Sequence, residues 1–195
     1  MCDLPLRLRS SDGATPMKLN SPEPNLIDFQ PLTVETFRPY GWLLGKPIRM
    51  AASIPAFSEV EIDFWEEHVF DPGVGGETEV LWVAYRNRQR EVTSLEAHRL
   101  TQQAIVPLSG DIIHVVAGSR QDGSLDESSM SAFRIPVGQG ICMRPGCWHS
   151  TRVDAAEVTC LMLTRRSTTV DLIGYLRGGS WLLESAIATA ERAIP

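Results

Sequence analysis

The sequence contains no run of about eighteen consecutive apolar residues, the length from which a transmembrane helix is expected. Its first residues have no apolar core of the kind that a signal peptide requires. A clustered basic face is also missing, and 18 basic and 24 acidic residues leave a formal net charge of -6. These three absences predict a protein with no membrane partner and no nucleic-acid partner.

The sequence also has few cysteines, and its four cysteines form no C-x-x-C pair. Cys142, Cys147 and Cys160 lie in apolar segments that favour strands. Such positions indicate buried free thiols rather than metal ligands or disulfides, because unpaired cysteine is among the most often buried residue types. Free thiols and the missing signal peptide together predict a cytoplasmic protein.

The composition is that of an ordinary globular chain, with 43% hydrophobic and 22% charged residues over 195 positions. Residues 1–25 are rich in serine and proline, which predicts a flexible N-terminal leader. Many short strands separated by turn residues follow. They predict a single mainly β domain, a β-barrel or jelly roll, over residues 26–178.

Two segments predict helices. Thr33 is a candidate N-cap for a short helix over Val34–Phe37. Residues 179–195 predict a C-terminal amphipathic helix, because apolar residues recur on one helical stripe. The stripe consists of Leu183, Ile187, Ala190 and Ile194.

Alternation of apolar and polar residues predicts the strands. Val60–Phe64 has the pattern of a half-buried strand. Leu81–Tyr85 and Val92–His98 flank the polar turn Arg86–Arg90 and predict a hairpin. The second strand of this hairpin carries the first group of candidate functional residues.

Glu96 and His98 are two residues apart, so on a strand they share one face. Gln103 and Gly110 complete the pattern E-x-H-x4-Q-x6-G, which resembles the first cupin motif, H-x-H-x4-E-x6-G. Farther along the chain, the segment GQGICMRPGCWH resembles the second cupin motif and ends at His149.

Within the cupins, LExHxxxxQAxxPxxG, an Ala-Phe pair and GQGxxxxPGxWH resemble the ureidoglycolate lyase family most closely, from about residue 32 to residue 163. The resemblance implies a cytoplasmic, usually dimeric β-barrel enzyme of purine (allantoin) degradation that splits ureidoglycolate into glyoxylate and urea. It also implies that the functional site contains Glu96, His98, Gln103 and His149.

The chain departs from this family pattern at several positions. Ser131 stands where an arginine precedes the Ala-Phe pair, and Ser150-Thr151 replace the region of a proline after the Trp-His pair. An arginine is the natural partner of a substrate carboxylate, because its planar fork binds two oxygens at once. The departures therefore predict a divergent member whose substrate is ureidoglycolate or a similar small ureido or hydroxy acid.

The four inward-facing candidates, Glu96, His98, Gln103 and His149, offer nitrogen and oxygen donors to a metal. Mixed donors of this kind suit a divalent Ni, Mn, Fe or Zn ion. The alternative is that they line a metal-free pocket as hydrogen-bonded polar residues. Nothing in the sequence predicts an organic cofactor.

Glu96 and His114 are the candidate bases for removing the substrate hydroxyl proton. His114 alternates with apolar neighbours, so an ordinary core histidine is the competing interpretation. Arg144 and Arg134 are candidates for holding the substrate carboxylate, together with Gln103 as a further substrate contact.

Trp148 is the remaining candidate substrate contact, because it is the neighbour of His149. The alternation of a strand favours the opposite orientation, in which Trp148 belongs to the barrel wall.

Three functions stay open at this point. The first is a lyase on ureidoglycolate. The second is a metal-dependent cupin isomerase or oxygenase acting on another small carboxylic acid, and the third is a non-catalytic cupin that binds a small ligand. The expected partners are a small-molecule substrate and a second copy of the chain in a homodimer.

Overall fold

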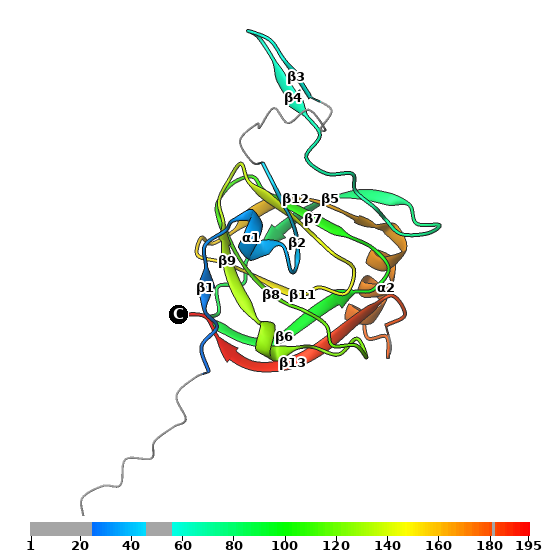
Figure 1. Cartoon of the computed structure of the whole chain (residues 1–195). Coiled ribbons are helices and arrows are strands. Elements are labelled where there is room, and N and C mark those ends of the chain that lie inside the picture. The colour runs from blue at the N-terminus through cyan, green and yellow to red at the C-terminus, as the bar shows by residue number, and fades with distance from the viewer. Residues whose placement is uncertain (1–24, 46–55, 181) are drawn as a thin grey trace, which may run out of the picture.

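The computed structural model describes residues 25–45, 56–180 and 182–195. Two β-sheets face each other and form a barrel (Figure 1). The first has six strands in the order β1-β9-β8-β11-β6-β13, and the second has five in the order β2-β10-β7-β12-β5. This architecture confirms the predicted mainly β, cupin-type jelly roll.

The bounds of the strands follow the sheet order. The six-stranded sheet contains β1 (Phe29–Gln30), β9 (Ser131–Ile135), β8 (Ile112–Ala117), β11 (Trp148–Val153), β6 (Glu91–His98) and β13 (Ser185–Ala193). The five-stranded sheet contains β2 (Gly41–Leu44), β10 (Gly140–Met143), β7 (Gln103–Pro107), β12 (Val158–Arg165) and β5 (Thr78–Tyr85).

The predicted N-terminal helix is confirmed as α1 (Val34–Phe37). Thr33 caps it through a reciprocal pair of bonds: the Thr36 amide donates to the Thr33 hydroxyl at 3.2 Å, and the Thr33 amide donates to the Thr36 hydroxyl at 3.1 Å. This arrangement satisfies two backbone donors that a helix start otherwise leaves unpaired. Phe37 then anchors the helix, with its ring edge-on to Phe133 at 5.3 Å.

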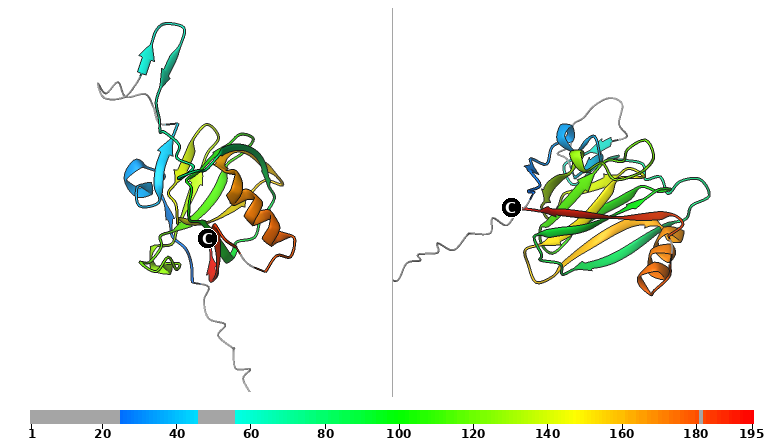
Figure 2. Two further views of the ribbon diagram at one scale, coloured as in Figure 1. Left: turned by 90° about the vertical axis from the view of Figure 1, so that its right-hand side faces the viewer. Right: turned by 90° about the horizontal axis from the view of Figure 1, so that it is seen from below.

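Two further short elements lie outside the sheets. The 3-10 helix η1 (Glu127–Ser129) follows β8, and the helix α2 (Arg166–Leu176) continues directly from β12. Figure 2 shows α2 lying against one end of the barrel, beside the start of β13.

Apolar residues form two buried clusters, one on each face of the six-stranded sheet. The interior cluster fills the space between the sheets and includes Ile105, Val116, Phe133, Ile141 and Met162. The outer cluster covers the other face of the six-stranded sheet and includes Val92, Ile113, Val115, Ala132 and Trp148. Because successive side chains of a strand point to opposite faces, every second residue of these strands faces the barrel interior and the others face outward. We call this alternation the parity of a residue on its strand.

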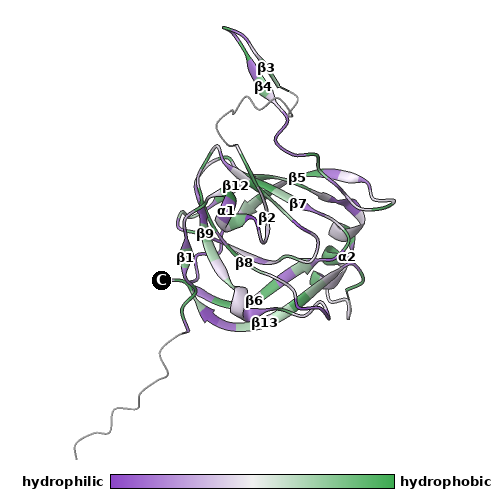
Figure 3. Ribbon diagram, viewed as in Figure 1, coloured by the Kyte–Doolittle hydropathy of each residue, from purple (hydrophilic) through white to green (hydrophobic). Residues whose placement is uncertain are grey.

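The predicted C-terminal helix is wrong. Ser185–Ala193 forms the nine-residue strand β13, which pairs antiparallel with β6 and closes the edge of the six-stranded sheet. The residues of the predicted stripe do not share one buried face, because Leu183 is 74% exposed whereas Ala190 is only 5% exposed. Without β13, the outer backbone groups of β6 would have no strand to pair with. This tertiary pairing favours a strand at Ser185–Ala193, and the periodicity of the local sequence does not reveal it. The barrel domain thus extends beyond residue 178 to the end of β13, along which hydrophobic and hydrophilic bands alternate (Figure 3).

Two smaller predictions about strands are also wrong. The half-buried strand predicted over Val60–Phe64 is part of the hairpin of β3 (Ala56–Ser58) and β4 (Asp63–Trp65), which projects away from the barrel (Figure 1). Furthermore, β5 and β6 do not pair with each other, since β5 lies in the five-stranded sheet and β6 in the six-stranded one. The predicted flexible leader lies outside the described residues.

The structure agrees with the predicted free thiols. Cys142, Cys147 and Cys160 are buried and unpaired. Burial raises the pKa of Cys142 and of Cys147 to about 12 and that of Cys160 to about 11. No helix in the described part of the chain is both long and apolar enough to cross a membrane.

Candidate metal centre

Three of the predicted metal ligands meet inside the barrel. Glu96 and His98 lie on the inner face of β6, and His149 on the neighbouring strand β11 pairs directly with Glu96. The ligand atoms of these three residues all lie within 4.8 Å of one another. The strand pleat and the strand register therefore bring together residues that are 53 positions apart, from 96 to 149.

Backbone contact fixes the ring of His149. Its Nδ1 donates to the Cys147 carbonyl at 3.0 Å, so its Nε2 carries the lone pair. This Nε2 lies 3.4 Å from Oε1 of Glu96 and has no hydrogen-bond partner among the described residues. A buried ring nitrogen with a free lone pair is what a metal ligand requires.

His98 is oriented in a similar way by a side chain. Its Nδ1 lies 2.9 Å from the hydroxyl of Ser185 on β13. Its Nε2 is buried and without a hydrogen-bond partner in the part of the chain that the structure describes. Because an unpartnered buried polar atom is costly, two such nitrogens beside one carboxylate fit a bound divalent cation.

The electrostatics of the three residues agree with this arrangement. Burial alone raises the pKa of Glu96, but the interactions with His149 and the other nearby histidines outweigh it and lower the pKa below the ordinary 4.5. Burial, reinforced by His149, lowers the pKa of His98 from 6.5 to about 4. At neutral pH the site therefore holds an ionised carboxylate beside a neutral His98, the protonation states that metal binding needs.

His114 lies behind His149 and supports it. The two rings stack with centroids 5.6 Å apart, while Nδ1 of His114 is 3.1 Å from the Thr151 hydroxyl and Nε2 is 3.2 Å from the sulfur of Met143. Burial, with a further effect of His149, lowers the pKa of His114 to about 3. A fully buried imidazole with both nitrogens engaged favours the core interpretation over the general base.

Gln103 faces the interior from the opposite wall. It lies on β7 and pairs with Met143 of β10, whose sulfur contacts His114. Directly paired residues share a face of the sheet, so Gln103 is directed into the barrel. It faces the same barrel interior as the histidines, but from the other sheet.

Two predicted substrate contacts point away from the site. Trp148 belongs to the outer apolar cluster. Arg134 pairs with Ile113 of that cluster, and its guanidinium lies 3.0 Å from the Asp154 carboxylate at the surface. Both residues have the wrong parity on their strands, so the structure does not place them beside His149.

Arg144 is also directed elsewhere. Its guanidinium carbon lies 4.8 Å from the centre of the Trp42 ring. Trp42 pairs with Cys142, whereas their neighbours Leu43 and Ile141 pack in the interior cluster. The Arg144 guanidinium therefore lies over the outer side of the five-stranded sheet. Arg144 also lines a crevice of about 220 Å³, together with Tyr40 and with Ala117 at the end of β8.

Two polar residues near the site, Ser185 and Glu79, are not among the candidates that the sequence predicts. The helix predicted over residues 179–195 is incompatible with the contact that Ser185 makes with His98 from β13. Glu79 lies on β5 in phase with Leu81, Val83 and Tyr85, which pack against the interior cluster. That alternation is visible in the sequence and is the signal that identifies Glu79 as inward-facing.

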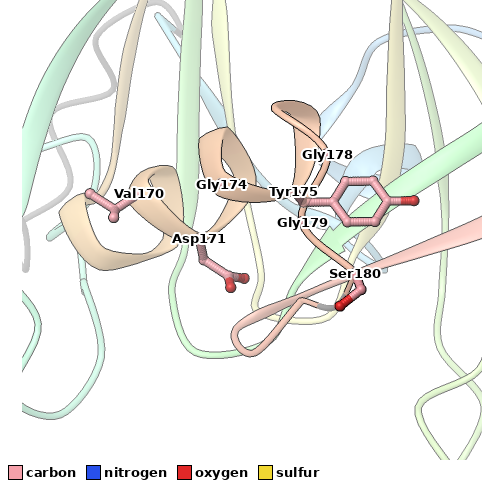
Figure 4. Close-up of a pocket in the computed structure, with 7 residues that line it drawn as sticks. All are labelled: Val170, Asp171, Gly174, Tyr175, Gly178, Gly179 and Ser180. Atoms are coloured by element: carbon pink, nitrogen blue, oxygen red, sulfur yellow. The ribbon is translucent and has the colours of Figure 1, made fainter.

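A surface hollow beside α2 is separate from the histidine cluster. Its volume is about 380 Å³, and Figure 4 shows its lining residues. The only carboxylate in the lining, Asp171, accepts hydrogen bonds from the backbone amides of Leu183 and Glu184. This carboxylate is thus occupied in joining α2 to the start of β13.

Comparison with known proteins identifies the family. The model of the family described as "Ureidoglycolate lyase" matches residues 24–173. The chain belongs to the ureidoglycolate lyase family. Ureidoglycolate lyases of two Burkholderia mallei strains, NCTC 10229 and NCTC 10247, are each 29% identical over 150 residues, covering 72% of this chain and 82% of theirs.

Solved structures resemble this ureidoglycolate lyase family member more distantly. A dTDP sugar isomerase from Desulfovibrio desulfuricans G20 has a TM-score of 0.42 and 12% identity, over 77% of this chain and 85% of that one. An oxalate decarboxylase has a TM-score of 0.36 and 14% identity, over 47% of this chain and 22% of that one.

Proposed function

We propose that the chain cleaves ureidoglycolate into glyoxylate and urea. The observation that carries the proposal is the donor set of Glu96, His98 and His149, with both imidazole Nε2 atoms unpartnered, inside the barrel of a ureidoglycolate lyase family member. A small hydroxy acid offers a hydroxyl and a carboxylate oxygen to such a site. The substrate can therefore be positioned by the same residues that hold the cation.

His98, His149 and one oxygen of Glu96 are the residues that would hold a divalent metal. When bound, such an ion supplies Lewis-acid chemistry that lowers the pKa of a coordinated hydroxyl. Ser185 and the Cys147 carbonyl keep the two imidazoles in the required orientation. The donor set suits Ni, Mn, Fe or Zn.

The proton transfers are assigned to Glu96. Its carboxylate is ionised at neutral pH, because the surrounding histidines lower its pKa, and its side chain is 35% exposed within the barrel. It accepts the proton of the substrate hydroxyl while the C–O bond becomes C=O and the C–N bond breaks. The proton then passes to the leaving nitrogen, which completes urea. A positioned group of this kind contributes roughly two to four orders of magnitude to the rate.

The experiment that tests the proposal measures glyoxylate and urea released from racemic ureidoglycolate. The purified protein is assayed after metal removal and after addition of Ni, Mn, Fe or Zn. We expect equal amounts of the two products and turnover that depends on the metal. Absence of turnover with all four metals would contradict the proposal and direct the search toward other small carboxylic acids.

A cytoplasmic location and a homodimer are further proposals. Trp82 is 72% exposed and Val80 is 64% exposed on the outer face of β5, and exposed apolar neighbours of this kind mark interaction sites. We expect light scattering to give the mass of a dimer, and Trp82→Glu to shift it toward the monomer. Val170→Glu, which changes an exposed residue of α2, is the matched control.

A further inference from the structure

The wall opposite the histidines carries a row of polar side chains. Thr164 of β12 pairs with Glu79 of β5. Leu163 pairs with Ala104, so the next step along both strands brings Thr164 beside Gln103. Cross-strand neighbours share one face of a sheet. Gln103, Thr164 and Glu79 thus form a continuous row on the inner face of the five-stranded sheet.

Two atoms of this row lack partners. Oε1 of Glu79 and the hydroxyl of Thr164 are buried and make no hydrogen bond to any described residue. Thr164 is only 2% exposed. Leaving a buried polar atom unpaired costs about 1–3 kcal/mol, so a ligand that satisfies both atoms binds with a corresponding advantage.

The row lies at the same end of the barrel as His98. Ser185, which contacts His98, follows Glu184 in the sequence. The Glu184 carboxylate lies 3.4 Å from Nε of Arg165, which follows Thr164. A short chain of contacts therefore joins the His98 wall to the Thr164 wall, and a small molecule held by His98 faces the row.

From this geometry we infer that Glu79 and Thr164 bind the ureido group of the substrate, an inference that rests on the proposed function. The group –NH–CO–NH2 presents two parallel N–H bonds, which match the two oxygens of a carboxylate as a guanidinium does. The Thr164 hydroxyl accepts or donates one further bond. The carboxylate and hydroxyl end of the substrate then lies at the cluster of His98 and His149 on the six-stranded sheet. Glu79 thereby selects carbamoylated acids over plain hydroxy acids.

The test uses hydantoate (N-carbamoylglycine), which has the ureido group and the carboxylate but no hydroxyl and so cannot be cleaved by this reaction. Its dissociation constant is measured by calorimetry on the metal-loaded protein, beside N-acetylglycine, which keeps one N–H. We expect the wild-type protein to prefer hydantoate. Glu79→Gln should raise the hydantoate dissociation constant roughly 10- to 100-fold, the loss expected for hydrogen bonds to a charged group.

Thr164→Val is the second variant, because it removes the unpaired hydroxyl at nearly constant volume, and we expect it to weaken hydantoate binding several-fold. Glu77→Gln is the matched control: Glu77 lies two residues before Glu79, and its side chain is 76% exposed near Arg166. It should bind hydantoate like the wild type. Metal content should be unchanged in all three variants.

The outcomes separate the inference from the proposed function. Hydantoate binding that depends on Glu79, without turnover of ureidoglycolate, supports the ureido subsite and contradicts the lyase. Turnover with wild-type hydantoate affinity in both Glu79→Gln and Thr164→Val overturns the subsite and leaves the lyase. Loss of metal from Glu79→Gln, or no hydantoate binding by the wild-type protein, also overturns the inference.

Discussion

Glu96 and His149 face each other across the neighbouring strands β6 and β11, with Oε1 of the carboxylate 3.4 Å from Nε2 of the imidazole. The contact ties the two halves of the site together, since each residue comes from a different sequence motif. It also holds Glu96 as a carboxylate, because the effect of His149 opposes the desolvation that would favour the neutral acid.

Replacement of this carboxylate should remove most of the activity. Glu96→Gln keeps the size of the side chain but loses its charge and its ability to accept a proton, so we expect turnover of ureidoglycolate to fall by roughly 100-fold or more. Glyoxylate release measures the effect. Glu157→Gln, which affects only the surface ion pair with Arg86, should behave as the wild type. Turnover of Glu96→Gln within twofold of wild type would exclude Glu96 from proton transfer.

Metal loading should stabilise the folded protein through His98 and His149. A ligand present at about 100 times its dissociation constant adds roughly 2.7 kcal/mol to the free energy of unfolding, which corresponds to a rise in Tm of about 5–11 °C at this chain length. We expect His149→Ala to abolish the rise, as measured by thermal unfolding and metal analysis. His68→Ala is the control, since His68 stacks on Trp42 and lies outside the cluster. An equal rise in both variants would place the metal elsewhere.

Ser185 should act on the metal through His98. Removing a side chain that orients a metal ligand typically lowers metal affinity 10- to 100-fold. We therefore expect Ser185→Ala to weaken metal binding by about this factor in a competition titration with a chelator. Thr189→Ala changes an exposed residue on the same strand and should leave the affinity unchanged. Unchanged affinity in both would show that the backbone of β6 alone fixes His98.

The buried histidines should make the metal-free protein acid-sensitive. The pKa values of His98 and His114 are lowered from 6.5 to about 4 and about 3 in the folded state. Below pH 6.5 the unfolded chain therefore binds protons that the folded chain does not, and the free energy of unfolding decreases as the pH falls toward 4. Each histidine contributes roughly 1.4 kcal/mol per pH unit in this window.

Urea unfolding of the metal-free protein at several pH values between 7 and 4 measures this slope. His98→Gln removes one of the two titrating groups and should reduce the slope by about half. A slope that stays the same in this variant would mean that other groups cause the acid sensitivity.

The sequence predicts which candidate residues lie together where the geometry is local. Glu96 and His98 share a face because they are two residues apart on a strand, and His149 of the second motif lies in the same cluster. Parity also explains two misplaced contacts, since Trp148 and Arg134 follow the alternation of their strands away from the interior. Their positions were predictable from the pleat alone.

The features that the sequence did not yield depend on tertiary pairing. A helical period fits the apolar residues Leu183, Ile187, Ala190 and Ile194. The segment nevertheless forms a strand, because it pairs with the otherwise open edge of β6. The assignment of β5 and β6 to different sheets likewise depends on which neighbours are available. The contact between the Ser185 hydroxyl and His98 depends on the pairing of β13 with β6, so it could not be predicted from a helix at these residues.

The candidate site is divided between two sheets, and this division determines where an inserted residue would change the direction of a site side chain. The segment between β6 and β7, residues 99–102, crosses from one wall of the barrel to the other. One extra residue there lengthens a connection and leaves His98 and Gln103 on their strands. One extra residue between Glu96 and His98 would instead turn one of them out of the barrel, since the side-chain period of a strand is two. We therefore expect a change of length to be less disruptive in the segment between the walls than within β6 itself.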